Sequence, residues 1–165
     1  MQNYCSKIFN WISEGNSEKL KEMDKRNLMR CLKDGRNPLH EACFQGEIEI
    51  VRYLLDLGFD PNEEDAEGNS PIHLAFCNGN VEVVKLLVNR GADPNKRDKQ
   101  GFPLLHKAYY LEMDDLVRFL LDNRADPEVR DNFGLKYFEY GKIVGCELYL
   151  KGIQTEPDPD EVSLD

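Results

Sequence analysis

The sequence lacks the features that mark membrane, secreted and nucleic-acid-binding proteins. Its apolar stretches, such as residues 50–55 and 81–88, are far shorter than the roughly 18 residues that a membrane span requires. Residues 1–10 contain no basic segment followed by the long apolar segment of a signal peptide. The net charge of -10 disfavours nucleic-acid binding, which depends on basic side chains that neutralise phosphates. We expect no direct contact with membranes or nucleic acids.

Common catalytic motifs are also absent. There is no Gly-rich phosphate-binding loop, no G-x-S-x-G nucleophile elbow and no H-E-x-x-H zinc motif. Carboxylates are abundant, but Glu63, Glu64, Asp65 and Glu67 fall in one predicted loop, where solvent keeps them as ordinary charges and not as a tuned acid–base pair. We therefore predict a protein that is not an enzyme and uses no cofactor.

The five cysteines form no recognisable disulfide or metal-binding pattern. They are odd in number, widely spaced and include no C-x-x-C pair. This pattern favours a reduced intracellular chain, located in the cytoplasm, the nucleus or both. Cys43 and Cys77 fall at small helix positions, where we expect them to act as compact apolar residues of the core.

The sequence does contain a register that returns every 33 residues. It is clearest for His40, His73 and His106. The same step relates one set of glycines and one of aspartates: Gly35, Gly68, Gly101 and Gly134; Asp60, Asp93 and Asp126. Self-similarity at a fixed period is typical of stacked copies of one small unit. Stacked units present an extended surface, so binding is the first functional hypothesis.

One period contains signals for two helices and a turn. Ser70 can cap a helix, and Pro71 suits its first position. That helix ends near Gly79, after which residues 81–88 repeat apolar side chains with helical spacing. Gly91 ends the second helix, and a turn follows. Each unit is therefore predicted to form a helix, a turn, a second helix and an extended β-turn finger.

These residues resemble the ankyrin repeat family. Residues 37–42 (NPLHEA) and 70–75 (SPIHLA) are similar to its T-P-L-H-x-A motif, and residues 58–62 and 91–95 to its G-A-D-x-N element. The resemblance extends over about residues 35–145 and implies an all-α solenoid of stacked helix-turn-helix units with β-turn fingers. It also implies that the repeated histidine is structural and hydrogen-bonds near the start of the first helix.

The histidines are poor candidates for a shared metal site. Stacked helices of neighbouring repeats lie about 10 Å apart, whereas zinc–histidine bonds measure about 2.0–2.1 Å. One ion therefore cannot contact histidines of successive repeats, and we predict that the protein holds no metal.

The register divides the chain into one domain, residues 1–152, and a tail. Three full repeats are expected at residues 35–67, 68–100 and 101–133, between degenerate caps at residues 1–34 and 134–152. In the N-terminal cap Phe9 and Leu20 take the places of His40 and Val51, although the step is 31 residues. The tail, residues 153–165, is acidic without a basic residue, so we expect it to be disordered.

The third full repeat departs from the motif. Pro103 and Leu104 replace its first residues, Glu112 replaces the glycine that ends the first helix, and Arg124 replaces the glycine that ends the second. A left-handed conformation at Arg124 costs roughly 1–2 kcal/mol relative to glycine. We expect the C-terminal half of the domain to be less stable than the rest.

The resemblance implies that fingers and the outward side of each first helix hold a partner in a concave groove. The predicted partner-binding residues occupy these positions: Arg36, Glu41, Phe44, Gln45, Glu67, Asn69, Leu74, Asn78, Lys99, Phe102, Lys107, Tyr110, Leu111, Phe133 and Tyr140. Aromatic residues, which are typical interface anchors, gather toward the end of the stack. Alternatively, the cap turns Leu135, Ile143 and Val144 inward to complete the core. A further alternative is that acidic and basic residues of neighbouring fingers form ion pairs with each other.

We interpret the chain as a non-catalytic adaptor that binds another protein and is monomeric by itself. Its acid excess favours a basic partner. Residues 126–134 and the acidic tail resemble the end of small acidic fungal ankyrin-repeat chaperones of a ribosomal protein, which implies an escort role. The alternatives are an inhibitor or regulator of a transcription factor or kinase, and a pathogen effector that docks a host protein.

Overall fold

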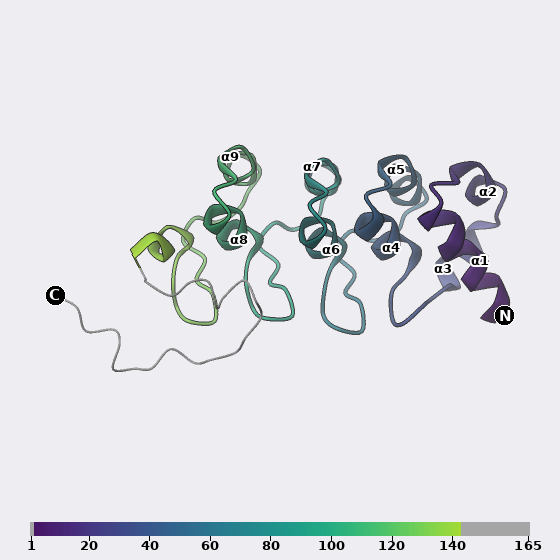
Figure 1. The fold of residues 1–165 in the computed structure, drawn as a ribbon, viewed down its shortest axis with the longest axis horizontal. Helices are drawn as coiled ribbons and strands as arrows, with labels where there is room; N and C mark the ends of the chain where they lie inside the picture. Colours follow the sequence, from purple (N-terminus) through teal and green to yellow (C-terminus); the bar gives the residue numbers. More distant parts are fainter. Residues whose placement is uncertain (1, 143–165) are drawn as a thin grey trace.

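Pairs of helices stack along one axis in the computed structural model, which describes residues 2–142 (Figure 1). The first helices of the pairs form one row, the second helices form another, and long loops project as fingers on the side of the first row (Figure 1). The pairs are α4 (Pro38–Gln45) with α5 (Ile48–Asp56), α6 (Pro71–Cys77) with α7 (Val81–Asn89), and α8 (Leu104–Tyr110) with α9 (Asp114–Asp122). This arrangement confirms the predicted helical solenoid.

Helix α4 shows how local residues set the bounds of a helix. The Asn37 side chain accepts a hydrogen bond from the backbone N–H of His40 at 3.1 Å and caps the first turn. The helix ends at Gly46, whose φ of 81° is left-handed. A Cβ at Gly46 would lie 2.5 Å from Asn80 Oδ1, and Asn80 Nδ2 donates to the carbonyl of Phe44 at 3.0 Å. Glycine therefore permits a contact that joins two repeats.

A continuous hydrophobic core runs between the two rows of helices. Each second helix turns an apolar face inward, with these buried residues: Ile50, Val51 and Leu54; Val83, Val84 and Leu87; Leu116 and Leu120. Cys43 is buried as expected, and burial raises the pKa of its thiol. Cys77 is exposed, so its predicted place in the core is wrong, because it is the last residue of α6 and lies beyond the buried turn.

The N-terminal cap contains three helices instead of one pair: α1 (Gln2–Ser13), α2 (Ser17–Lys21) and α3 (Lys25–Arg30). Phe9 and Leu20 are buried, which confirms that both continue the core register. A disulfide joins Cys5 of α1 to Cys31, directly after α3, with Cα atoms 5.2 Å apart. The expectation of a fully reduced chain is therefore wrong, because α3 carries Cys31 back to α1.

The described part of the chain ends in a short 3-10 helix, η1 (Tyr137–Lys142). It begins 33 residues after Leu104, the first residue of α8, as the register predicts for the first helix of a cap. The rest of the expected cap, including Ile143 and Val144, and the tail at residues 153–165 lie outside the described residues. Between residues 2 and 142 no helix is both long enough and apolar enough to cross a membrane.

Two helix ends of the third repeat are left-handed without a glycine. Glu112 has a φ of 56° and Arg124 a φ of 72°, where the preceding repeat has Gly79 and Gly91 at 75° and 94°. Arg124 therefore adopts the left-handed conformation that is costly for a residue other than glycine. Asn95 Nδ2 donates to the carbonyl of Arg124 at 2.9 Å, so this strained residue is tied to the preceding repeat.

Candidate functional site

Each of the first two buried histidines joins a first helix to the finger that follows it. His40 Nε2 donates to the carbonyl of Glu63 at 3.0 Å, and His73 Nε2 donates to that of Lys96 at 3.1 Å. Burial lowers the pKa of both histidines below 6.5, so both are neutral at neutral pH. Their Nδ1 atoms accept the backbone N–H groups of Asn37 and Ser70, both at 3.4 Å, which confirms the hydrogen bond expected near the start of the first helix. Among the described residues, no group of three His, Cys, Asp or Glu side chains is placed to hold a metal ion.

Each finger closes around one buried aspartate, and we name the fingers accordingly: the Asp65 finger (residues 59–69), the Asp98 finger (92–102) and the Asp131 finger (125–135). The three residues are 6%, 7% and 5% exposed. In every case Oδ1 accepts the backbone N–H groups two and four residues later, at 2.8–3.0 Å. The prediction that Asp65 is a solvated charge is therefore wrong, because the turn requires a buried acceptor. The sequence signal is a D-x-x-G pattern that repeats every 33 residues.

The second carboxylate oxygen distinguishes the three fingers. Asp65 Oδ2 pairs with Arg36 Nε at 3.3 Å, and Asp98 Oδ2 pairs with Lys107 Nζ. Asp131 Oδ2 is buried and accepts no hydrogen bond from any described residue. Burial alone would raise the pKa of Asp65, but the turn's N–H groups and Arg36 outweigh it and hold that pKa below its ordinary value.

The third histidine also contacts its finger differently. His106 Nε2 donates to the carbonyl of Leu135, 29 residues later, at 2.9 Å, whereas His40 and His73 each reach a carbonyl 23 residues later. Pro103 stands at the N-cap of α8 and makes no side-chain cap there. The Asp131 finger is therefore attached to α8 through Leu135, which follows the turn, and not through a residue that precedes it.

Several predicted partner-binding residues are occupied by contacts within the chain. Glu67 and Lys99 pair at 2.9 Å, which confirms that neighbouring fingers pair with each other. Arg36 and Lys107 hold the aspartates of the Asp65 and Asp98 fingers. These charges stabilise the stack before any partner arrives.

The polar positions of the first repeats are engaged in the same way. Glu41 Oε1 accepts a hydrogen bond from Gln45 Nε2 at 2.7 Å. Asn78 Nδ2 donates to the carbonyl of Phe44 at 2.6 Å, and the Arg36 guanidinium lies 5.5 Å from the centre of the Phe44 ring. The polar side chains in the first half of the predicted surface are thus largely engaged in contacts within and between repeats.

Three predicted partner-binding residues are buried in the free chain. Asn69, Leu74 and Phe102 are only 7%, 5% and 6% exposed. Phe102 packs against Phe133 with ring centres 5.8 Å apart. The expectation that Phe102 projects into the groove is wrong, because its backbone N–H closes the Asp98 turn and its ring lies against the next finger.

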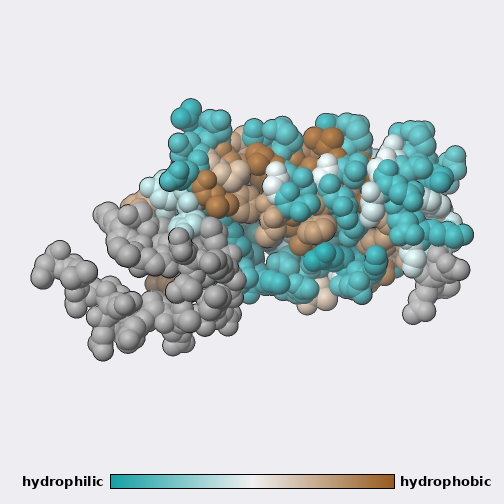
Figure 2. All heavy atoms as spheres, viewed as in Figure 1, coloured by the Kyte–Doolittle hydropathy of each residue, from teal (hydrophilic) through white to brown (hydrophobic). Residues whose placement is uncertain are grey.

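Exposed apolar side chains lie at the two ends of the stack. At the C-terminal end Leu111, Phe133 and Phe138 are 46%, 41% and 41% exposed. The first two belong to the predicted set. Phe138 does not, and its exposure follows from the position of η1. Tyr110 is partly buried, and the side chain of Tyr140 lies outside what the structure describes. On the face in Figure 2, hydrophilic side chains mostly cover the fingers and the outer ends of α5, α7 and α9.

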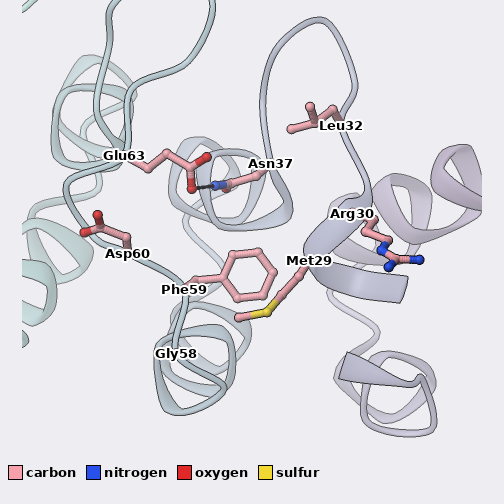
Figure 3. A pocket seen from close by; sticks show the side chains of 8 residues that line it. All are labelled: Met29, Arg30, Leu32, Asn37, Gly58, Phe59, Asp60 and Glu63. Carbon is pink, nitrogen blue, oxygen red and sulfur yellow. Dashed lines mark hydrogen bonds between the residues drawn. The ribbon is translucent and has the colours of Figure 1, made fainter. Parts of the chain in front are cut away.

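A hollow of about 420 Å³ opens in the N-terminal half. It is lined by Met29, Arg30, Leu32, Asn37, Gly58, Phe59, Asp60 and Glu63. Met29 and Phe59 face each other across it, while Arg30 points away (Figure 3). Asn37 Nδ2 donates to Glu63 Oε2 at 2.7 Å and fixes one edge. The hollow depends on α3, a helix that the repeat register does not predict.

Comparison with known families agrees with this geometry. The family model described as ankyrin repeats (3 copies) matches residues 2–98 and residues 57–131. Together these matches include the N-terminal cap and nearly all of the three full repeats. A search of curated proteins found no match.

Proposed function

Because the chain belongs to the ankyrin repeat family, whose repeats generally mediate protein–protein interactions, we propose that it is a non-catalytic adaptor for a basic protein. The partner binds at the C-terminal end of the stack, on the side of α8 and the Asp131 finger. The family is typically non-catalytic, in keeping with an adaptor.

The observation that carries this proposal is the exposure of Leu111 and Phe133. Large apolar side chains at a protein surface mark interaction sites when they gather in one region. No large hydrophobic side chain is exposed between residues 33 and 110, so the C-terminal end differs from the repeats before it. The N-terminal group of Tyr4, Met29 and Leu32 lies at the opposite end of the chain and serves as a control.

The charge of the chain supports a basic partner. The net charge of -10 favours encounter with a positively charged protein and disfavours an acidic one. The finer form of the proposal is an escort or chaperone of a basic protein, such as a ribosomal protein. Identification of a transcription factor or kinase as the partner would instead support the inhibitor hypothesis.

Affinity capture from a native cell extract tests the proposal with three forms of the full chain. The wild type is compared with Leu111→Ser/Phe133→Ser and with the matched control Met29→Ser/Leu32→Ser, since both pairs remove exposed apolar side chains. We expect the wild type and the control to capture the same basic protein, and the C-terminal pair to lose about tenfold in capture. High salt reduces capture by the wild type.

Two results would count against this function. Equal capture by both double variants would move the interface away from the C-terminal end. A captured partner that is acidic, or whose binding is indifferent to salt, would contradict the charge argument. Circular dichroism of each variant establishes that a loss of capture does not reflect unfolding.

A further inference from the structure

The Asp131 finger buries a carboxylate that is only half satisfied. Oδ1 accepts the N–H groups of Phe133 and Leu135 at 2.8 and 3.0 Å. Oδ2 is shielded from solvent, and no donor among residues 2–142 reaches it. A buried charge without a partner is costly, whereas asparagine would supply the same single acceptor without that charge. The acid at this position therefore has a use that the turn alone does not explain.

The register shows what the Asp131 finger has lost. Arg36 lies 29 residues before the aspartate of its finger, and Lys107 lies nine residues after the aspartate of its own. The equivalent positions around Asp131 are Phe102 and Tyr140. Both cation positions are thus replaced by aromatic residues, while the acid is kept.

Nearby basic side chains are committed to other acceptors. Arg97 and Arg130 each donate to the carbonyl of a glycine four residues later. Lys136 pairs with Glu128. In the described part of the chain, no flanking cation is therefore left to hold Asp131 Oδ2.

The Asp65 finger shows which side chain would complete the site. Arg36 pairs with Asp65 Oδ2 at 3.3 Å while its guanidinium lies 5.5 Å from the ring centre of Phe44. Planar guanidinium groups suit this double role of pairing with an acid and stacking on an aromatic ring. In the Asp131 finger, Phe133 provides an exposed ring two residues from the acid.

We infer that Asp131 is a docking site for one arginine side chain of a partner protein, whose guanidinium pairs with Oδ2 and stacks on Phe133. The inference rests on the proposed function and names the chemistry that the partner presents there. Since Oδ2 is shielded from solvent in the free chain, docking requires this oxygen to become accessible. The arginine then supplies to Asp131 the charge that Arg36 supplies to Asp65, but from outside the chain, because Phe102 occupies the position equivalent to Arg36.

The two N–H groups bonded to Asp131 provide a direct assay. The probes are an acetylated, amidated pentapeptide, Ala-Leu-Arg-Leu-Ala, and the same peptide with neutral citrulline in place of arginine. In NMR titrations of the full chain, we expect the arginine peptide to shift the amide resonances of Phe133 and Leu135 and to bind about tenfold more tightly than the citrulline peptide. The amides bonded to Asp65 and Asp98 serve as internal controls and stay in place.

The variant Asp131→Asn keeps the acceptor for the turn and removes the charge. We expect it to abolish the preference for arginine while the control amides keep their positions. Equal binding of both peptides to the wild type, absence of shifts at Phe133 and Leu135, or an arginine preference that survives in Asp131→Asn would each overturn the inference. If capture of the basic partner still depends on Leu111 and Phe133 in that event, the proposed function stands and only the arginine site fails.

Discussion

The Asp98 and Asp131 fingers close with the same turn but treat their aspartates differently. In both, one carboxylate oxygen accepts two backbone N–H groups. The Asp98 carboxylate also pairs with Lys107, and the two side chains are only 3% and 13% exposed. The second oxygen of Asp131 accepts no hydrogen bond from any described residue. The turn therefore needs only one carboxylate oxygen, and the second is available either for stability or for binding.

Removal of Lys107 makes the Asp98 finger resemble the Asp131 finger, and it should have the largest effect. We expect Lys107→Met to lower the free energy of unfolding by about 3 kcal/mol, because a buried charge loses its partner. The double variant Lys107→Met/Asp98→Asn should recover most of this loss, since it removes both charges. Urea denaturation followed by circular dichroism measures these differences.

The matched control is Asp131→Asn, which should leave the free energy of unfolding unchanged or slightly higher. A loss as large as that of Lys107→Met would mean that a cation of this chain already holds Asp131, which would contradict the comparison. In Lys107→Met the amides of Gln100 and Phe102 should also begin to respond to the arginine peptide. Their continued silence would show that an unpaired carboxylate is not sufficient for binding.

Acidification tests the histidines that attach the fingers. Burial lowers the pKa of His40, His73 and His106 below 6.5, so below that pH the unfolded chain binds more protons than the folded chain. The histidine contribution to stability is full above pH 6.5 and is lost as the pH falls through the lowered pKa values. Urea denaturation at pH 7.5 and 5.5 should therefore show lower stability at pH 5.5.

Single substitutions extend this test to the two fingers. His73→Gln and His106→Gln each remove one titrating group and should each reduce the difference between pH 7.5 and pH 5.5. A difference that neither variant changes would assign the pH dependence to other groups. The decrease in pH dependence caused by His73→Gln reports on the attachment of the Asp98 finger. The decrease caused by His106→Gln reports on that of the Asp131 finger.

Exchange of two helix-ending residues tests the backbone difference between the second and third repeats. Arg124 is left-handed with a φ of 72°, and its counterpart Gly91 has a φ of 94°. We expect Arg124→Gly to raise the free energy of unfolding by about 1 kcal/mol and Gly91→Arg to lower it by about 1–2 kcal/mol. Thermal unfolding followed by circular dichroism measures both changes.

The Gly91 substitution is a clean control, because a Cβ at this position would meet no atom within 4 Å. A loss of stability there is therefore not caused by a clash of the added Cβ, and the left-handed backbone is its expected source. A destabilising Arg124→Gly would show that the Arg124 side chain contributes more than its backbone strain costs.

Local signals explain why so much of the fold was predictable from the sequence. Pro71 and Gly91 mark helix ends through their own conformational preferences, so the register predicts the bounds of α6 and α7 closely and the start of η1. The left-handed Arg124 follows in the same way, because its position in the repeat is that of a glycine.

Contacts between distant segments explain what the sequence did not reveal. The Cys5–Cys31 disulfide depends on the extra helix α3, which the 33-residue register does not contain. Phe102 is an aromatic residue at a predicted finger position, which is typical of an interface anchor, but Phe133 of the next finger packs against it. The unpaired oxygen of Asp131 emerges only when three fingers are compared in space, because pairing with Arg36 and Lys107 arises from different positions of the repeat.

The exposed pair between Glu67 and Lys99 should have the smallest effect. Its side chains are 55% and 47% exposed, so water screens the charges that approach within 2.9 Å. A double-mutant cycle with Glu67→Gln and Lys99→Met should give a coupling energy below about 0.5 kcal/mol, against several times that for Asp98 and Lys107. Equal coupling energies would mean that burial does not strengthen the Asp98–Lys107 pair over the exposed pair. A buried, unpaired Asp131 carboxylate would then have no physical reason to favour binding an arginine.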